Sequence, residues 1–174
     1  MALLMKLITN EGSGKLQLCF MSYNSRGLGV LKQNYCKYLS SRAVVGNKIP
    51  ILCNQEHFIS RGNSYKIKQA LPDSYILINP AEKSTHCKGR ARGGLFISVP
   101  EHFKNNIQDI SPGYWRLQAA LIEAGDSTIL LINSYFPVNT KAVTIDEVEL
   151  NEIFQHIRDI IDNNNFYSLW GHKL

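Results

Sequence analysis

The segment Ile49–His57 (IPILCNQEH) constrains the fold more than any other part of the chain. Its apolar start, Ile49–Cys53, is too short for a typical helix and is bounded by glycine and proline, which predicts a buried β-strand. A polar cluster ending in Glu56 follows at once. The strand therefore brings a carboxylate to a sheet edge, where open α/β sheets place their ligands and where oxygen atoms can hold a divalent metal. A solvated strand-end acid is the alternative for Glu56 taken alone.

The composition predicts one soluble domain with a substantial core. The 174 residues are 44% hydrophobic and 19% charged, as in ordinary globular proteins. No apolar run reaches the roughly 20 residues that span a bilayer, so no membrane partner is expected. The start lacks a signal-peptide pattern and the four cysteines form no Cys-x-x-Cys pair, which favours an intracellular protein, nuclear or cytoplasmic, with reduced thiols. Residues 1–15, ending in Glu-Gly-Ser-Gly-Lys, are expected to be a leader and flexible joint before a domain over 16–174.

Charge is distributed unevenly along the chain. Residues 1–100 carry 14 Lys and Arg against 4 Asp and Glu, whereas residues 101–174 carry 5 against 10. A basic first part suggests a polyanionic partner such as nucleic acid. An ordinary basic surface explains the same counts equally well.

Hydrophobic periodicity predicts alternating strands and helices. Besides the central strand, we expect strands at Leu16–Tyr23, Tyr75–Asn79, Arg92–Val99, Trp115–Glu123, Thr128–Tyr135 and Phe166–Trp170. The strand–helix–strand opening predicts a parallel pair, and the two strands flanking Ala124-Gly-Asp-Ser predict an antiparallel hairpin.

Helices are expected at 28–45, at 61–71 and from the capping box Thr144-x-x-Glu147 to about Asp162. The last has an apolar stripe at helical spacing, formed by Leu150, Ile153, Phe154, Ile157, Ile160 and Ile161. We assign this stripe to packing.

Four short motifs fall in order at predicted strand ends or in loops between strands. They are Asn24-x-x-Gly, Gln55-Glu56, the Arg-Gly-Gly of Gly89–Gly94, and Tyr135-Phe-Pro. The series resembles the endonuclease/exonuclease/phosphatase superfamily, most closely the endonuclease domain of non-LTR (LINE-type) retrotransposons, over about residues 16 to 171. The resemblance implies an α/β fold of two mixed sheets packed face to face and flanked by helices.

The resemblance also implies roles for individual residues. Glu56 would hold Mg²⁺, with Mn²⁺ as an alternative, and Asn24 would orient the metal-site carboxylate or a phosphate oxygen. Tyr135 would place a phenol near the scissile phosphate. Asn24 taken alone is better explained as a turn asparagine, and Tyr135 taken alone is equally well a strand-end aromatic.

The loop from Lys83 to Arg92 carries four cations in ten residues. Arginine binds phosphate through two hydrogen bonds and neighbouring glycines let the backbone approach closely. We therefore take Lys88, Arg90 and Arg92 as candidate DNA contacts, with a solvated loop as the alternative. No feature indicates a protein partner.

The chain departs from the family pattern at its end. Where the family has Gly-Asp-x-Asn, this chain has Gly171, His172 in place of the aspartate, and Leu174 in place of the asparagine. We therefore expect the first part of a Mg²⁺-dependent DNA endonuclease that nicks retrotransposon target sites, truncated at its C-terminus and inactive by itself. The alternatives are a non-catalytic nucleic-acid-binding remnant and a phosphatase of the same superfamily.

Overall fold

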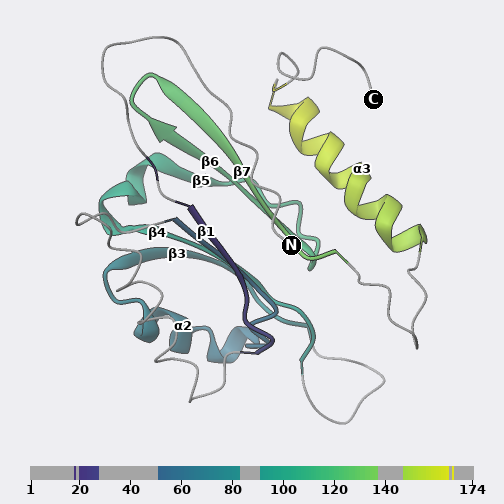
Figure 1. The fold of residues 1–174 in the computed structure, drawn as a ribbon, viewed down its shortest axis with the longest axis horizontal. Helices are drawn as coiled ribbons and strands as arrows, with labels where there is room; N and C mark the ends of the chain where they lie inside the picture. Colours follow the sequence, from purple (N-terminus) through teal and green to yellow (C-terminus); the bar gives the residue numbers. More distant parts are fainter. Residues whose placement is uncertain are drawn as a thin grey trace.

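The computed structural model describes residues 18, 20–27, 51–82, 91–136, 147–164 and 166. Within these ranges two β-sheets pack face to face, with helix α2 on the outer side of one sheet and helix α3 on the outer side of the other (Figure 1). The helix expected over 28–45 and the leader expected over 1–15 lie outside the described residues.

The first sheet has four strands in the order β1-β2-β4-β3. They are β1 (Phe20–Asn24), β2 (Ile51–Gln55), β3 (Ser74–Asn79) and β4 (Leu95–Pro100). Strand β1 runs parallel to β2, as predicted, and β4 is antiparallel to both of its neighbours. The ends of β1, β2 and β3 therefore meet the start of β4 at one edge, which we call the Glu56 edge.

Strand β2 is longer at its polar end than the sequence predicted. The expected strand stopped at Cys53, but pairing with β4 continues through Asn54 to Gln55, which lies opposite Leu95. Both polar side chains are buried. Their side-chain hydrogen bonds are made inside the fold, so the strand continues beyond the apolar run from which it was predicted.

The second sheet is antiparallel, in the order β5-β6-β7. Its strands are β5 (Ile107–Asp109), β6 (Leu117–Ala124) and β7 (Ser127–Ser134). Strands β6 and β7 confirm the predicted hairpin, with Ala124 opposite Ser127 at its turn. The 3₁₀ helix η3 (Glu101–Asn106) and the short β5 that follows were not predicted.

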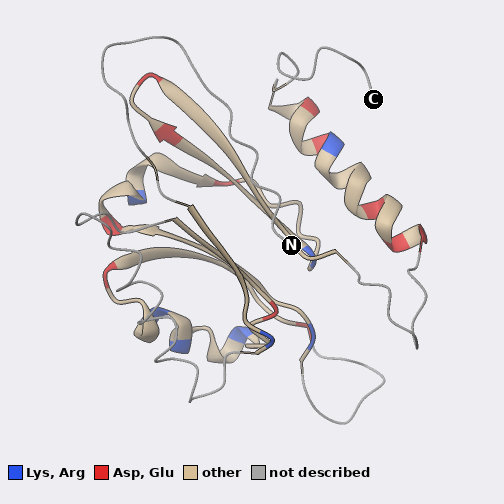
Figure 2. Cartoon of the chain, in the orientation of Figure 1, with Lys and Arg blue, Asp and Glu red and all other residues tan. Residues whose placement is uncertain are grey.

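Opposite charges lie on the two outer layers (Figure 2). The 3₁₀ helix η2 (Arg61–Asn63) and α2 (Tyr65–Ala70) carry three cations and no acid. Helix α3 (Glu147–Asn163) carries five acids against one arginine. The uneven charge of the sequence thus becomes a basic side and an acidic side in the described part of the fold.

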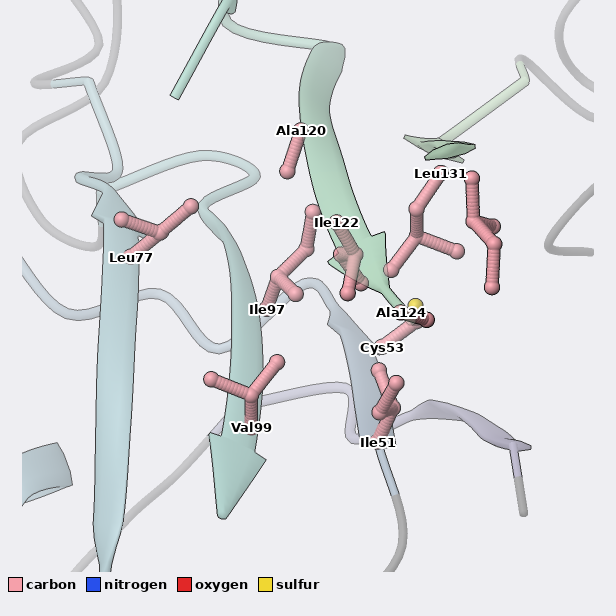
Figure 3. Packing of buried hydrophobic residues seen from close by; sticks show 10 residues of the cluster. Ile51, Cys53, Leu77, Ile97, Val99, Ala120, Ile122, Ala124 and Leu131 are labelled. Carbon is pink, nitrogen blue, oxygen red and sulfur yellow. The ribbon is translucent and has the colours of Figure 1, made fainter. Parts of the chain in front are cut away.

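The main core lies between the sheets (Figure 3). Side chains of β2, β3 and β4, including Ile51 and Ile97, pack against side chains of the β6–β7 hairpin, including Ile122 and Leu131. Cys53 belongs to this core as a free thiol, and burial raises its pKa to about 12. This agrees with the prediction of a reduced core cysteine; the other three cysteines lie outside the described residues.

The helices cover the outer sheet faces. Helix α2 confirms the predicted short polar helix, and its Ile67 and Ala70 pack on β2, β3 and β4. Helix α3 buries Ile153, Ile157 and Ile160 against β6 and β7.

Three residues of the predicted apolar stripe of α3 are not fully buried: Leu150 and Ile161 are half-buried and Phe154 is exposed. Phe154 remains 45% exposed and contacts the Phe136 ring, with the ring centroids 5.8 Å apart. Phe154 therefore lies outside the buried line of Ile153, Ile157 and Ile160. Thr144 and residues 167–170 of the expected last strand fall outside the described ranges. Among the helices that the structure describes, none combines the length and apolarity of a membrane span.

Candidate functional site

The turn after β1 is bound to the residues that follow β2. Ser25 N donates to Gln55 O at 2.9 Å, and Gly27 N donates to Glu56 O at 2.5 Å. The Ser25 hydroxyl lies 3.1 Å from Gln55 O and 3.2 Å from Glu56 O. Because β1 and β2 are parallel neighbours, these contacts bring Asn24 and Glu56 to the same edge of the sheet.

Asn24 forms part of this turn through its side chain. Its Oδ1 accepts a hydrogen bond from Arg26 N at 3.0 Å, which is the geometry of an Asx turn. Arg26 and Gly27 both have positive φ, +48° and +103°. Asn24 therefore has the turn role that its residue type favours, and it has that role beside Glu56.

Glu56 is held in a backbone conformation that side chains rarely adopt. Its φ is +58°, and Phe58 two residues later has φ +55°. Such residues cost roughly 1–3 kcal/mol each and gather at functional sites. Hydrogen bonds from the next two amides hold the segment: His57 N donates to Gly94 O at 3.3 Å and Phe58 N to Gly93 O at 2.9 Å.

Tyr135 reaches Glu56 from the other sheet. It follows directly on the last residue of β7, and its phenol lies close enough to the Glu56 carboxylate for the two groups to interact. Burial, followed by this interaction and the negative charge of Glu56, raises the pKa of Tyr135, while the Arg116 guanidinium opposes the rise. Two of the residues chosen from sequence motifs 79 positions apart are therefore in contact.

A buried amide joins the two sheets beneath that contact. Asn133, fully buried on β7, accepts from Gln55 Nε2 at 2.7 Å. Its own Nδ2 donates to the carbonyl oxygens of Asn54 and Phe96 at 3.0 and 3.1 Å. Gln55 precedes Glu56 and Asn133 lies two residues before Tyr135, so this network sets the separation of the two site residues.

The two glycines before β4 have a packing role. A Cβ on Gly94 (φ +88°) would lie 2.7 Å from both ring nitrogens of His57, and one on Gly93 (φ +64°) would lie 2.6 Å from the Trp115 ring. His57 is fully buried, and burial lowers its pKa to about 4. Sequence reasoning assigned these glycines to the approach of a phosphate; the described contacts are with an imidazole and an indole.

The candidate DNA loop begins and ends close to the Glu56 edge. Glu82 and Arg92 pair as an antiparallel bridge, with amide-to-carbonyl distances of 3.1 and 2.8 Å. Arg92 is exposed and stands two residues before Gly94. Lys88 and Arg90 lie outside the described residues, so of the three candidate contacts only Arg92 is located.

Sequence reasoning missed Arg116, which contacts Tyr135 directly. The guanidinium carbon lies 5.0 Å from the centre of the Tyr135 ring, and Nη1 lies 3.5 Å from Tyr135 O. One feature of the sequence could have indicated that Arg116 is important. Arg116 is the sole cation between Lys104 and Lys141, in a stretch that forms most of a sheet.

The donor set around Glu56 fits a hard, well-hydrated cation. Across the described ranges, no three His, Cys, Asp or Glu side chains come close enough together to hold a metal ion. Zinc and other metals that require several protein ligands therefore do not fit the described residues. Mg²⁺ commonly takes one or two carboxylates and completes its shell with water and phosphate oxygens, and Glu56 with the amide oxygen of Asn24 is compatible with such a site.

Comparison with known proteins supports the fold described above. Neither the known protein families nor the curated proteins contain a match to this chain. Among solved structures, the crystal structure of AP endonuclease LMAP from Leishmania major matches with a TM-score of 0.51 and 13% sequence identity. The match covers 77% of this chain and 46% of that one, so the chain spans less than half the length of the solved structure. The likeness confirms the expected fold, an α/β sandwich of two sheets packed face to face.

Proposed function

We propose that the Glu56 edge is part of a Mg²⁺-dependent site for phosphodiester hydrolysis in DNA. The observation that carries the proposal is the contact between the Tyr135 phenol and the Glu56 carboxylate, made by residues from two different sheets. The left-handed backbone of Glu56 supports it, because strain of this kind persists where a side chain must be aimed. The fold is compatible with this chemistry.

Each residue has a distinct part in the proposed site. Glu56 would hold Mg²⁺, or Mn²⁺ in its place, and Asn24 would fix the adjacent turn and offer an amide oxygen. Bound metal stabilises negative charge on phosphoryl oxygens and on the leaving oxygen. Tyr135, whose pKa is raised, keeps its proton at neutral pH and can donate a hydrogen bond to the carboxylate or to a phosphate oxygen.

DNA is the proposed substrate, and nicking of retrotransposon target sites is the proposed role. The basic excess of residues 1–100 and the loop that begins and ends at Glu82 and Arg92 support a polyanion over a small phosphorylated molecule. A DNA substrate also implies a nuclear or cytoplasmic protein. Within the described residues, Glu56 does not belong to a group of three metal-ligating side chains. Metal binding and DNA binding therefore test the proposal more directly than DNA cleavage does.

The metal assignment is tested by Mn²⁺ binding, followed by electron paramagnetic resonance, in the wild type and in Glu56→Gln. We expect weak binding in the wild type and none in the variant, since the site relies on this carboxylate together with water. Glu123→Gln, an exposed acid near the turn of the hairpin, is the matched control and should bind as the wild type does. Equal binding by the wild type and Glu56→Gln would remove Glu56 from the site.

The DNA assignment is tested by the salt dependence of binding to a mixed-sequence duplex. Replacing Lys88, Arg90 and Arg92 by alanine should weaken binding to all sequences and reduce the slope of log K against log salt by about 0.9 for each phosphate that is no longer neutralised. A control variant with Lys66, Lys68 and Arg158 replaced removes the same charge from α2 and α3. If the slope falls equally in both variants, the loop is an ordinary basic surface.

A further inference from the structure

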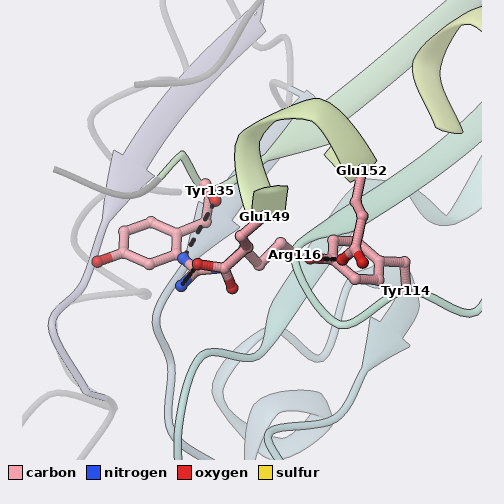
Figure 4. Close-up of polar contacts among 5 residues, drawn as sticks. All are labelled: Tyr114, Arg116, Tyr135, Glu149 and Glu152. Carbon is pink, nitrogen blue, oxygen red and sulfur yellow. Dashed lines mark hydrogen bonds and ion pairs between the residues drawn. The ribbon is translucent and has the colours of Figure 1, made fainter. Parts of the chain in front are cut away.

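Arg116 lies between helix α3 and Tyr135 (Figure 4). Its Nε and Nη2 donate to the two carboxylate oxygens of Glu149, at 2.5 and 3.0 Å. The pair is well shielded, with side-chain exposures of 11% for the arginine and 23% for the glutamate. Two parallel hydrogen bonds fix the plane of a guanidinium as well as its position.

The same guanidinium contacts two aromatic rings. Its carbon lies 4.0 Å from the centre of the Trp115 ring and 5.0 Å from that of Tyr135. Its third nitrogen, Nη1, points to Tyr135 O at 3.5 Å. The Arg116 main chain also holds Tyr135, because Arg116 O accepts from Tyr135 N at 3.0 Å.

These contacts form a chain of four side chains that crosses the molecule. Glu149, in the first turn of α3, holds Arg116, which lies against the ring of Tyr135. The phenol of Tyr135 in turn lies near the carboxylate of Glu56, which directly follows β2 of the opposite sheet. A tyrosine at the end of a strand can exchange between staggered rotamers unless its neighbours prevent it, and Arg116 occupies one side of this ring.

We propose that Arg116 is a positioning residue, which Glu149 of α3 holds in place so that the Tyr135 phenol stays directed at Glu56. A lysine could supply the positive charge, but it lacks the planar fork that binds a carboxylate and stacks on rings. The functional value of the arrangement rests on the proposed function, whereas the positional claim can be measured without metal or DNA.

The positional claim is tested by ¹⁹F NMR of protein labelled with 3-fluorotyrosine, with the Tyr135 signal assigned from its disappearance in Tyr135→Phe. In Glu149→Gln and in Arg116→Lys this signal should shift or broaden while the protein stays folded by circular dichroism. The matched control is Glu152→Gln, which removes the negative charge from the exposed contact at 3.3 Å between Tyr114 OH and Glu152 on the same helix. That control should leave the Tyr135 signal unchanged. An unchanged Tyr135 signal in both Glu149→Gln and Arg116→Lys would overturn the proposal.

A second measurement connects positioning to the proposed site. Mn²⁺ affinity should fall roughly tenfold in Tyr135→Phe, as expected when a metal ligand is deprived of a hydrogen-bond partner, and by a similar factor in Arg116→Lys. If Tyr135→Phe weakens metal binding and Arg116→Lys does not, Arg116 does not position Tyr135. If the wild type binds no Mn²⁺, the proposed function fails, and the NMR signals still decide whether Arg116 directs the ring.

Discussion

A Cβ atom added at Gly94 would lie 2.7 Å from Nδ1 of His57, so only glycine leaves room for the imidazole beside the start of β4. The ring is fixed on its other sides too. Nδ1 accepts from Ile59 N at 2.9 Å, and Nε2 lies 3.2 Å from Asn79 O and 3.3 Å from Leu95 O. His57 thus joins the segment that follows β2 to the end of β3 and the start of β4. His57 directly follows Glu56 in the chain. The contacts that fix its imidazole therefore also hold the backbone next to the candidate site.

Gly94→Ala should destabilise the protein much more than Gly113→Ala does. Both glycines have positive φ, +88° and +79°, but a Cβ at Gly113 meets nothing within 4 Å. Alanine is therefore strained by the backbone conformation at both positions. We expect Gly94→Ala to lower the free energy of unfolding by about 1–3 kcal/mol more than Gly113→Ala does, because the added methyl group forces His57 to move. Urea unfolding of the two variants measures the difference. Equal destabilisation would mean that the ring moves aside freely.

Stability should fall as the pH is lowered from 7.5 to 4, in part because of His57. Burial lowers its pKa from 6.5 to about 4, so between these values the unfolded chain binds a proton that the folded protein does not. The stabilisation is complete above pH 6.5, is lost as the pH falls towards 4, and amounts to about 3 kcal/mol in all.

The pH dependence of the free energy of unfolding, measured in urea, checks this expectation. His57→Gln should flatten the dependence between pH 7.5 and 4 relative to the wild type. His102→Gln, which removes an exposed histidine on η3, is the matched control. A slope in His57→Gln as steep as that of the wild type would assign the effect to other groups.

Asn133→Leu should cost about 2–4 kcal/mol. The change removes the partner of Gln55 Nε2 at 2.7 Å and both donors to the carbonyl oxygens of Asn54 and Phe96, leaving buried polar groups without compensation. Gln118→Leu is the contrasting variant. Its Nε2 makes one described bond across the sheets, to Leu77 O at 3.0 Å, while its buried Oε1 has no partner among the described residues.

Gln118→Leu should be close to neutral, because it removes a hydrogen bond together with a buried oxygen that lacked one. Chemical denaturation of both variants gives the comparison. Similar costs would show that Asn133 contributes no more than an ordinary cross-sheet contact. A Tyr135 ¹⁹F signal that shifts in Asn133→Leu alone would link the network to the candidate site.

Much of the secondary structure could be predicted from the sequence. The correctly predicted strands and helix are those whose residue pattern over a short stretch was sufficient. Alternating apolar residues predicted β6 and β7, and the Gly-Asp-Ser turn predicted their hairpin. The helical spacing of Ile153, Ile157 and Ile160 predicted α3. In these segments the intrinsic preference of the residues and the burial of their apolar side chains favour the same secondary structure. The sequence pattern therefore predicts that structure.

The errors arise where burial depends on distant partners. The polarity of Asn54 and Gln55 ended the predicted strand at Cys53, yet these side chains form hydrogen bonds with Ser25 and Asn133 inside the strand. Phe154 has the spacing of a core residue, but its side chain is 45% exposed. No local rule reports a partner that lies about 30 or about 80 residues away.

The order of residues is enough to indicate which residue types could form a site: an acid after a buried strand, an asparagine in a turn and a tyrosine at a strand end. That these residues lie together follows from the packing of the two sheets. Glu56 and Tyr135 meet because two sheets pack with the same ends together and because Asn133 sets their spacing. Arg116 gains its place in the same way, since its partners Glu149 and Tyr135 are adjacent only after α3 has packed on β6 and β7. The formation of a strand or a helix depends mainly on residues that are close together in the sequence. Contacts between separate strands and helices depend on packing, which is a property of the whole fold.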